Sequence, residues 1–275
     1  METRLQLTEE NFESQQSGKS DLLIHIGEEN ISYAIVDKGR EQLKALADYK
    51  ANLSDLDTIL ASDRYLKYFY RKIKISTNTF KFTFIPRDLY TDSDINNYAR
   101  FISPKSSADV LVNDIRPFRI RNVMAVDSEI QDLISARFNK PVLYSQANSF
   151  VEGAFKISAV ANLYSLCINL QQERLEMAVI KEGGLLFYNF FESKTPDELN
   201  YFLLLAIRQF NLNTDNTKVR IAGEAEKNDD NYARVEKYFS SIESADPVAF
   251  VQCSDTFNQI NLSRYFSLLS LNLCE

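Results

Sequence analysis

Residues 22–49 read LLIHIGEENISYAIVDKGREQLKALADY, and this stretch decides the fold class. Three apolar runs are separated by two short polar turns, Glu28–Asn30 and Lys38–Arg40. Short polar turns between apolar runs of this length are typical of β-hairpins. We therefore predict a meander of three antiparallel strands, at 22–26, 31–36 and 43–49.

The same order of apolar runs and turns recurs at residues 163–191, LYSLCINLQQERLEMAVIKEGGLLFYNFF. The predicted strands here are 163–170, 174–181 and 185–191. When Ala34 is aligned with Ala178, Gly39 falls on Gly183. Internal repetition is a structural signal before it is a functional one, so we predict that the chain is duplicated.

Helical and extended patterns alternate after each meander. The clearest helix start is Thr195-Pro196-Asp197-Glu198, a capping box with proline at the first helical position. In the first half we predict helices from about 54 and at 92–102, 128–138 and 147–158, and strands at 71–77, 79–85, 110–115, 120–126 and 141–144. In the second half we predict a helix from 196, a strand at 219–222 and a helix at 229–239.

Composition limits the possible functions. The chain has 275 residues, a length that suits two domains of ordinary size, and a net charge of −7. An acidic protein lacks the positive field that phosphate binding needs, which argues against nucleic acid as the main partner. One histidine and three scattered cysteines argue against a zinc site. The sequence shows neither an apolar run long enough to span a membrane nor a secretory signal, so we expect a cytoplasmic protein without membrane insertion.

The two meanders, each followed by alternating helices and strands, resemble the superfamily of actin, sugar kinases and heat-shock-chaperone ATPases. The chain is also similar to an uncharacterised bacterial family, a domain of unknown function assigned this fold. The resemblance covers most of the chain and implies a duplicated α/β fold of the actin-like ATPase, ribonuclease H-like type. We divide the chain into a flexible lead at 1–20, a first subdomain at 21–160 that contains an insertion, and a second subdomain at 161–275.

The resemblance also identifies the positions where active members of this superfamily hold phosphate. In those proteins the turn after the first strand of each half carries an acidic residue, any residue, and glycine. Small residues let backbone N–H groups approach phosphate, and the carboxylate holds magnesium or orients water. Here the two turns read His25-Ile26-Gly27 and Asn169-Leu170-Gln171. Neither acidic residue is kept, and only one glycine is.

The motif that holds the nucleotide base in active members is a strand that ends in consecutive small residues. Its nearest match is Ile221-Ala222-Gly223-Glu224-Ala225. The cofactor-binding positions that the resemblance implies are therefore Gly27, Asn169, Gln171, Gly223 and Glu224.

We predict a non-catalytic pseudo-ATPase that serves as a cytoplasmic scaffold or protein-interaction module. This prediction includes no catalytic residue, no metal, no bound cofactor and a protein partner that the sequence does not identify. The alternative is an enzyme that binds a nucleotide or a sugar phosphate in an unconventional site, in a cleft between the two subdomains.

Three further features have an ordinary structural interpretation. His25 lies within an apolar strand, so we expect a buried, hydrogen-bonded histidine rather than a catalytic group. Gly183-Gly184 lies between two strand-like runs, which favours a hairpin turn over a phosphate loop. Residues 65–74 interleave aromatic and basic side chains, and we expect them at a helix end and on strand faces rather than on a nucleic-acid or membrane surface.

Overall fold

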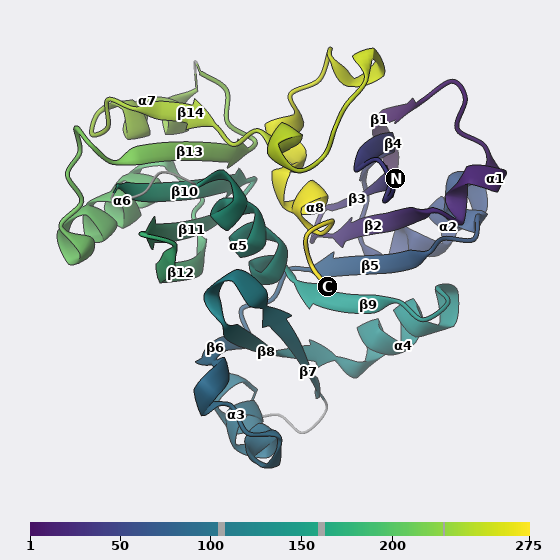
Figure 1. Cartoon of the computed structure of the whole chain (residues 1–275), viewed down its shortest axis with the longest axis horizontal. Helices are drawn as coiled ribbons and strands as arrows, with labels where there is room; N and C mark the ends of the chain where they lie inside the picture. The colour runs from purple at the N-terminus through teal and green to yellow at the C-terminus, as the bar shows by residue number, and fades with distance from the viewer. Residues whose placement is uncertain (104–107, 159–162, 228) are drawn as a thin grey trace. The chain divides into compact units, whose positions relative to one another are not determined.

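The structure is a computed structural model that describes residues 1–103, 108–158, 163–227 and 229–275 (Figure 1). The chain forms two compact units, both of the α/β class. The first unit comprises Met1–Ser149, Phe250–Ile260 and Leu268–Glu275. The second comprises Phe150–Ala249 and Asn261–Ser267. The predicted boundary at 160/161 therefore differs from the division seen here, and two C-terminal segments belong to the first unit.

The main sheet of the first unit has six strands in the order β1-β4-β3-β2-β5-β9. Their bounds are β1 Glu2–Thr8, β2 Ser20–Ile26, β3 Asn30–Asp37, β4 Gln42–Lys50, β5 Lys72–Thr77 and β9 Val142–Ser145. Strands β2, β3 and β4 form the antiparallel meander predicted from residues 22–49. Strand β5 is parallel to β2, and β9 is parallel to β5. Every residue of β2 is buried, as expected for a central strand covered on both faces.

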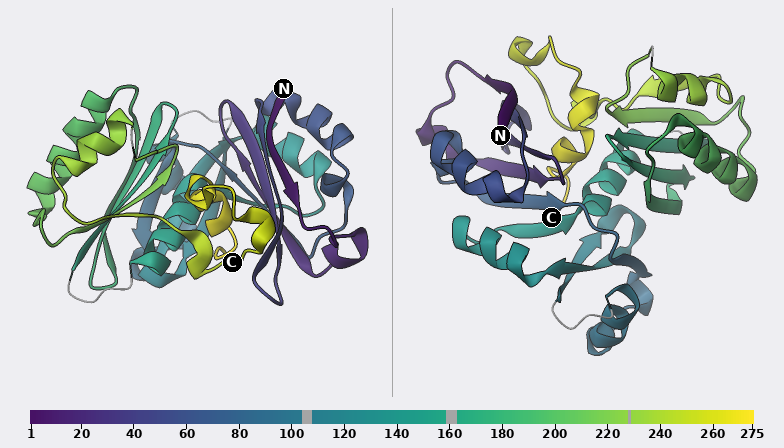
Figure 2. Two further views of the ribbon diagram at one scale, coloured as in Figure 1. Left: turned by 90° about the horizontal axis from the view of Figure 1, so that it is seen from above. Right: turned by 180° about the vertical axis from the view of Figure 1, so that it is seen from behind.

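Helices α2 (Leu56–Ser62) and α4 (Ser128–Arg137) cover one face of this sheet, and the short helix α1 (Ser14–Ser17) precedes β2. Helix α5 (Gln146–Ile157) follows β9 and passes from the first unit into the second after Ser149. Apolar side chains of α2 and α4 pack in one core with Leu22, Ile24 and Ile75. Figure 2 shows α2 and α4 on the same face of the sheet. Burying this core supplies the main favourable free energy of folding in the unit.

The predicted insertion forms a second sheet of three strands, in the order β6-β8-β7. The strands are β6 (Phe82–Pro86), β7 (Ala108–Ile115) and β8 (Ile120–Asp127), and α3 (Ile95–Ile102) contacts β6 and β8. Strands β7 and β8 form a long antiparallel hairpin.

The second unit repeats the strand order of the first. Its five strands follow the order β12-β11-β10-β13-β14. Their bounds are β10 Tyr164–Gln171, β11 Arg174–Lys181, β12 Gly184–Glu192, β13 Lys218–Gly223 and β14 Ile242–Ser244. β10, β11 and β12 are antiparallel, and β13 and β14 run parallel to β10, as β5 and β9 run parallel to β2. The matching order and directions are those expected of a duplication.

Two helices, α6 (Pro196–Phe210) and α7 (Asp230–Glu236), cover one face of this sheet (Figure 2). The capping box predicted at the start of α6 is present: Thr195 accepts a hydrogen bond from the Glu198 amide, and Glu198 accepts one from the Thr195 amide. The Gly183-Gly184 pair lies in the β11–β12 hairpin turn, as predicted, and Gly183 has a φ of +75°.

The N-terminal segment was predicted to be a flexible lead, and the structure contradicts this. Strand β1 pairs antiparallel with β4 and forms the edge of the six-stranded sheet. The last helix, α8 (Phe266–Ser270), begins in the second unit and ends in the first. Within the described residues, no helix has both the length and the apolar character needed to cross a membrane.

Candidate functional site

Four of the five residues implied by the resemblance lie at one end of the second unit's sheet. Asn169 and Gln171 are on β10, Gly223 ends β13 directly beside it, and Glu224 follows. The fifth residue, Gly27, belongs to the first unit. The structure thus brings together the turn after β10 and the end of β13, which the resemblance implied as the phosphate-binding and base-binding positions of the second unit.

The backbones of β10 and β13 leave no space at Gly223. This residue has a φ of +86°, and a Cβ atom on it would lie 2.0 Å from the Leu170 carbonyl oxygen. The amide of Glu224 donates a hydrogen bond of 2.6 Å to the same oxygen. Glycine is therefore required here by the contact between two strands, and this requirement is structural rather than one of ligand access.

Asn169 lies where the resemblance implies an acidic residue, and its side-chain amide binds a buried carboxylate. Its Nδ2 donates hydrogen bonds to Glu176 Oε2 at 2.6 Å and to the hydroxyl of Ser267 at 3.0 Å. The hydroxyl of Tyr188 donates to the other oxygen of Glu176 at 2.8 Å. A buried carboxylate needs such donors, because an unpaired charge in the interior is costly.

Burial raises the pKa of Glu176 to about 7, and the hydrogen bonds from Asn169, Tyr188 and Ser267 limit that rise. The carboxyl of Glu176 therefore takes up a proton more readily in the folded chain than in the unfolded one, where the pKa is about 4.3. Folding is stabilised most below the unfolded pKa, and this contribution is lost as the pH rises toward 7.

The remaining members of this group also have partners within the unit. The carboxylate of Glu224 forms an ion pair of 2.5 Å with Arg264, and both side chains are partly exposed. Gln171 is the last residue of β10, opposite Arg174 in the β10–β11 hairpin. The resemblance implies glycine at this position.

The first phosphate turn, in the first unit, is closed by its own hydrogen bonds. The amide of Gly27 donates to the carbonyl of Asn30 at 2.8 Å. A Cβ atom at Gly27 would lie 2.2 Å from Asn30 Oδ1, so the hairpin itself requires this glycine. His25 is buried, as predicted, and its Nδ1 lies 2.9 Å from the hydroxyl of Ser76. Burial lowers the pKa of His25 to about 4, so the ring is neutral near pH 7.

Sequence reasoning missed Glu176, Tyr188 and Ser267. Glu176 had a visible signal, because it is a single acidic residue within the apolar strand LEMAVI. Its hydrogen-bond partners come from β10, β12 and α8, and only the strand pairing brings them within reach.

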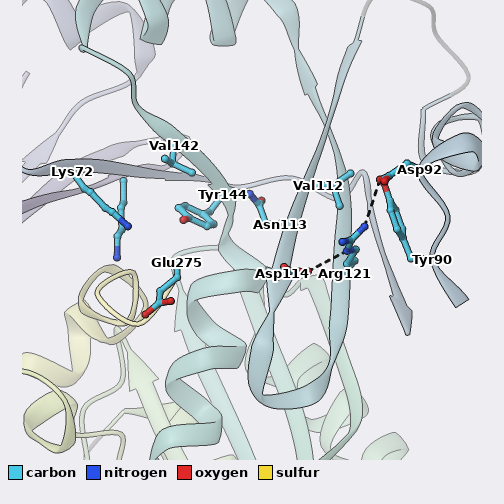
Figure 3. A pocket seen from close by; sticks show the side chains of 11 residues that line it. Lys72, Tyr90, Asp92, Val112, Asn113, Asp114, Arg121, Val142, Tyr144 and Glu275 are labelled. Carbon is cyan, nitrogen blue, oxygen red and sulfur yellow. Dashed lines mark hydrogen bonds and ion pairs between the residues drawn. The ribbon is translucent and has the colours of Figure 1, made fainter. Parts of the chain in front are cut away.

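The first unit also contains a cavity of about 420 Å³ (Figure 3). It is lined by residues of β5, β7, β8 and β9, including Lys74, Asn113, Arg121, Val142 and Tyr144. Lys72, Lys74 and Arg121 line it, together with the carboxylates of Asp92, Asp114 and Glu275. The Lys74 ammonium donates to the carbonyls of Leu271, Asn272 and Cys274, and Arg121 lies between Asp92 and Asp114.

The three cations of the lining are matched by three carboxylates, so the cavity has little net positive charge for an anionic ligand such as phosphate. In the described part of the chain, no group of three or more histidine, cysteine, aspartate or glutamate side chains is placed to hold a metal ion.

The close contact at Gly223 gives a direct test of this geometry. Gly223→Ala should lower the free energy of unfolding by about 3 kcal/mol, because the new methyl group meets the Leu170 carbonyl at a strained φ. Gly18→Ala is the matched control: Gly18 has a φ of −63° and open space around it, so a change within about 0.5 kcal/mol is expected. Urea denaturation measures both, and equal effects would contradict the described contact.

Solved structures share this fold over nearly the whole chain. A protein from Bacteroides thetaiotaomicron with an actin-like ATPase fold and unknown function is 17% identical, with a TM-score of 0.78, over 96% of this chain and 99% of that one. The PilM–PilN type IV pilus biogenesis complex contains a chain that is 12% identical, with a TM-score of 0.68, over 92% of this chain and 96% of that one. No curated protein matches the sequence.

These likenesses show that the chain has an actin-like ATPase fold, as the resemblance implied. Residues 9–242 match the family described as "Protein of unknown function (DUF3822)". The match covers most of the chain, and the chain therefore belongs to the DUF3822 family of unknown function.

Proposed function

We propose that this chain is a non-catalytic protein with an actin-like ATPase fold, and that it acts as a cytoplasmic scaffold or protein-interaction module. The observation that carries the proposal is that the polar groups of both turns, at Gly27 and at Asn169, form hydrogen bonds within the protein. The Gly27 amide binds Asn30, and the Asn169 amide binds Glu176.

The electrostatics of the turns support the same proposal. Magnesium bound to nucleotide prefers carboxylate and other oxygen ligands. The acid positions carry His25, which is neutral and bonded to Ser76, and Asn169, which acts as a donor. The nearest buried carboxylate in the second unit, Glu176, is already bound by three side-chain donors. These residues favour a closed interior over a magnesium site.

The cavity of the first unit suggests where a protein partner binds. Two of the strands that line it, β7 and β9, are edge strands of their sheets. The peptide groups of an edge strand can bind an extended segment of another protein, with side-chain pockets supplying specificity. The similar fold of PilM, whose structure is that of a PilM–PilN complex, supports a role in protein assembly.

Nucleotide binding separates the scaffold from the alternative enzyme. Mg-ATP, Mg-ADP and sugar phosphates should leave the thermal unfolding midpoint unchanged at millimolar concentration. A ligand at 100 times its Kd would stabilise the folded state by about 2.7 kcal/mol, which calorimetry detects readily. Stabilisation by any of these ligands that is reduced by Gln171→Ala, at the open end of β10, would support the enzyme instead.

Capture of a protein partner tests whether the cavity of the first unit is its binding site. The tagged chain should retain a specific protein from an extract of its source cells, equally well with and without Mg-ATP. Val142→Asp should abolish retention, because Val142 is 41% exposed on β9 at the cavity. Val248→Asp, at a 54% exposed valine of the second unit, is the matched control and should retain the partner. Retention by both variants would exclude the cavity as the binding place.

An acid at residue 169 tests whether the side chain at this position contacts the carboxylate of Glu176. Asn169→Asp would place a second carboxylate at the 2.6 Å contact with Glu176, and two buried carboxylates cannot both ionise. We expect a loss of about 3 kcal/mol in unfolding free energy at pH 8 and a clearly smaller loss at pH 5, where the pair can hold a proton.

Asn200→Asp is the matched control for this substitution. Asn200 Oδ1 accepts a hydrogen bond from Tyr238, and a carboxylate can accept the same bond. Its effect should not change between the two pH values. A loss at Asn169→Asp that is equal at pH 5 and pH 8 would show that Glu176 is not the partner of residue 169.

A further inference from the structure

Tyr144 places an unpaired hydroxyl in the cavity of the first unit. This residue of β9 lines the cavity and is 2% exposed. Its hydroxyl forms no hydrogen bond with any of the described residues, although buried tyrosine hydroxyls ordinarily have a partner. Burial raises the pKa of Tyr144, so the hydroxyl keeps its proton near neutral pH. A molecule in the cavity therefore meets a hydrogen-bond donor at this point.

Lys72 is a second donor without a partner. Its side chain is exposed, lines the same cavity, and forms neither a hydrogen bond nor an ion pair within the part of the chain that the structure describes. Between β5 and β9, Lys74 pairs with Val142 and Ser76 with Tyr144, and side chains two residues apart on a strand share a face. Lys72 and Tyr144 therefore project from one face of the main sheet (Figure 3).

The other charges of the lining fall into two groups. Arg121 lies between Asp92 and Asp114, at 3.6 and 3.2 Å, so the members of this group are paired with one another. Figure 3 shows Lys72 at one end of the cavity and Arg121 and Asp92 at the other. Glu275 is the remaining carboxylate of the lining. The two unpaired donors therefore lie apart from the carboxylates that bind the arginine.

The carboxylate of Glu275 is weakly held. It forms an ion pair with Arg116, and the two side chains are 58% and 61% exposed. An ion pair this exposed contributes little to stability, so another carboxylate can replace Glu275 at low cost. Without Glu275, the three cations of the lining face two carboxylates. The cavity then accepts one negative charge, which a carboxylate supplies and a phosphate dianion exceeds.

We propose that the cavity binds one carboxylate side chain of the protein partner, which accepts hydrogen bonds from the Tyr144 hydroxyl and the Lys72 ammonium in place of Glu275. This site rests on the proposed function, in which the partner binds at this cavity. Val112 and Val142 also line the cavity, so apolar residues beside the acidic one are favoured. Charge complementarity thus favours an acidic partner segment over a basic one.

Two blocked tripeptides that differ by one group test this site. Acetyl-Val-Glu-Val-amide carries a carboxylate where acetyl-Val-Gln-Val-amide carries a carboxamide of similar size. Nuclear magnetic resonance of the full chain with labelled valine methyl groups detects binding, because Val112 and Val142 lie at the cavity. The glutamate peptide should bind about tenfold more tightly than the glutamine peptide, since hydrogen bonds to an ionised acceptor are stronger. Inorganic phosphate at the same concentration should leave both methyl signals unchanged.

Single substitutions identify the donors. Tyr144→Phe and Lys72→Gln should each remove most of the preference for the glutamate peptide. Tyr144→Phe should also leave the free energy of unfolding unchanged in urea denaturation, because it removes a hydroxyl without a partner among the described residues. Glu275→Gln should tighten binding of the glutamate peptide, since it removes the competing carboxylate. Lys67→Gln is the matched control and should change nothing, because the Lys67 ammonium donates to the Ala61 carbonyl outside the cavity.

Equal binding of the two peptides, or no binding by either, would overturn this site. So would a preference that survives both Tyr144→Phe and Lys72→Gln. Butanoate that shifts the valine signals at the same concentration as the glutamate peptide would show a site for free small acids and overturn the role of a partner side chain. None of these results bears on where the partner binds, which capture with Val142→Asp measures separately.

Discussion

Hydrogen bonding of the polar groups at the ends of β2 and β10 is the constraint on which the rest of the structure depends. These strands are the centre of their sheets, so groups at their ends are buried and need partners. In the first unit the carbonyl of Asn30 accepts a hydrogen bond from the amide of Gly27. In the second unit the carboxylate of Glu176 accepts hydrogen bonds from Asn169, Tyr188 and Ser267. These groups are thus satisfied within their own units, at the positions where the resemblance to active ATPases implied phosphate binding.

Much of the fold could be predicted from the sequence, because it depends on local patterns. Apolar runs with short polar turns identified both meanders, and the capping box at Thr195 identified the start of α6. Strand β1 was missed although Leu5 and Leu7 alternate with Arg4 and Gln6, a strand pattern that charged ends obscured. The C-terminal return to the first unit was missed as well, since residues 247–265 form short 3-10 turns with weak periodicity.

The candidate site was predictable only in part. The resemblance implied Gly27, Asn169 and Gly223 as site positions, and the structure places Asn169 and Gly223 beside each other in the second unit and Gly27 in the first. The bond between Asn169 and Glu176 follows from the hairpin register, and the need for glycine at residue 223 follows from its positive φ and its contact with Leu170. Such contacts join residues that are distant in sequence. They require the strand pairing that the sequence pattern alone does not supply.

The buried ammonium of Lys74 has a consequence for the order of folding. Its hydrogen-bond acceptors are the carbonyls of Leu271, Asn272 and Cys274, almost two hundred positions later in the chain. During synthesis β5 and the buried Asp21, 3.7 Å from the Lys74 ammonium, emerge early, whereas the three carbonyls that bind this ammonium are made last. The first unit is therefore completed last. A chain that stalls late in translation leaves the Lys74 ammonium without these three acceptors.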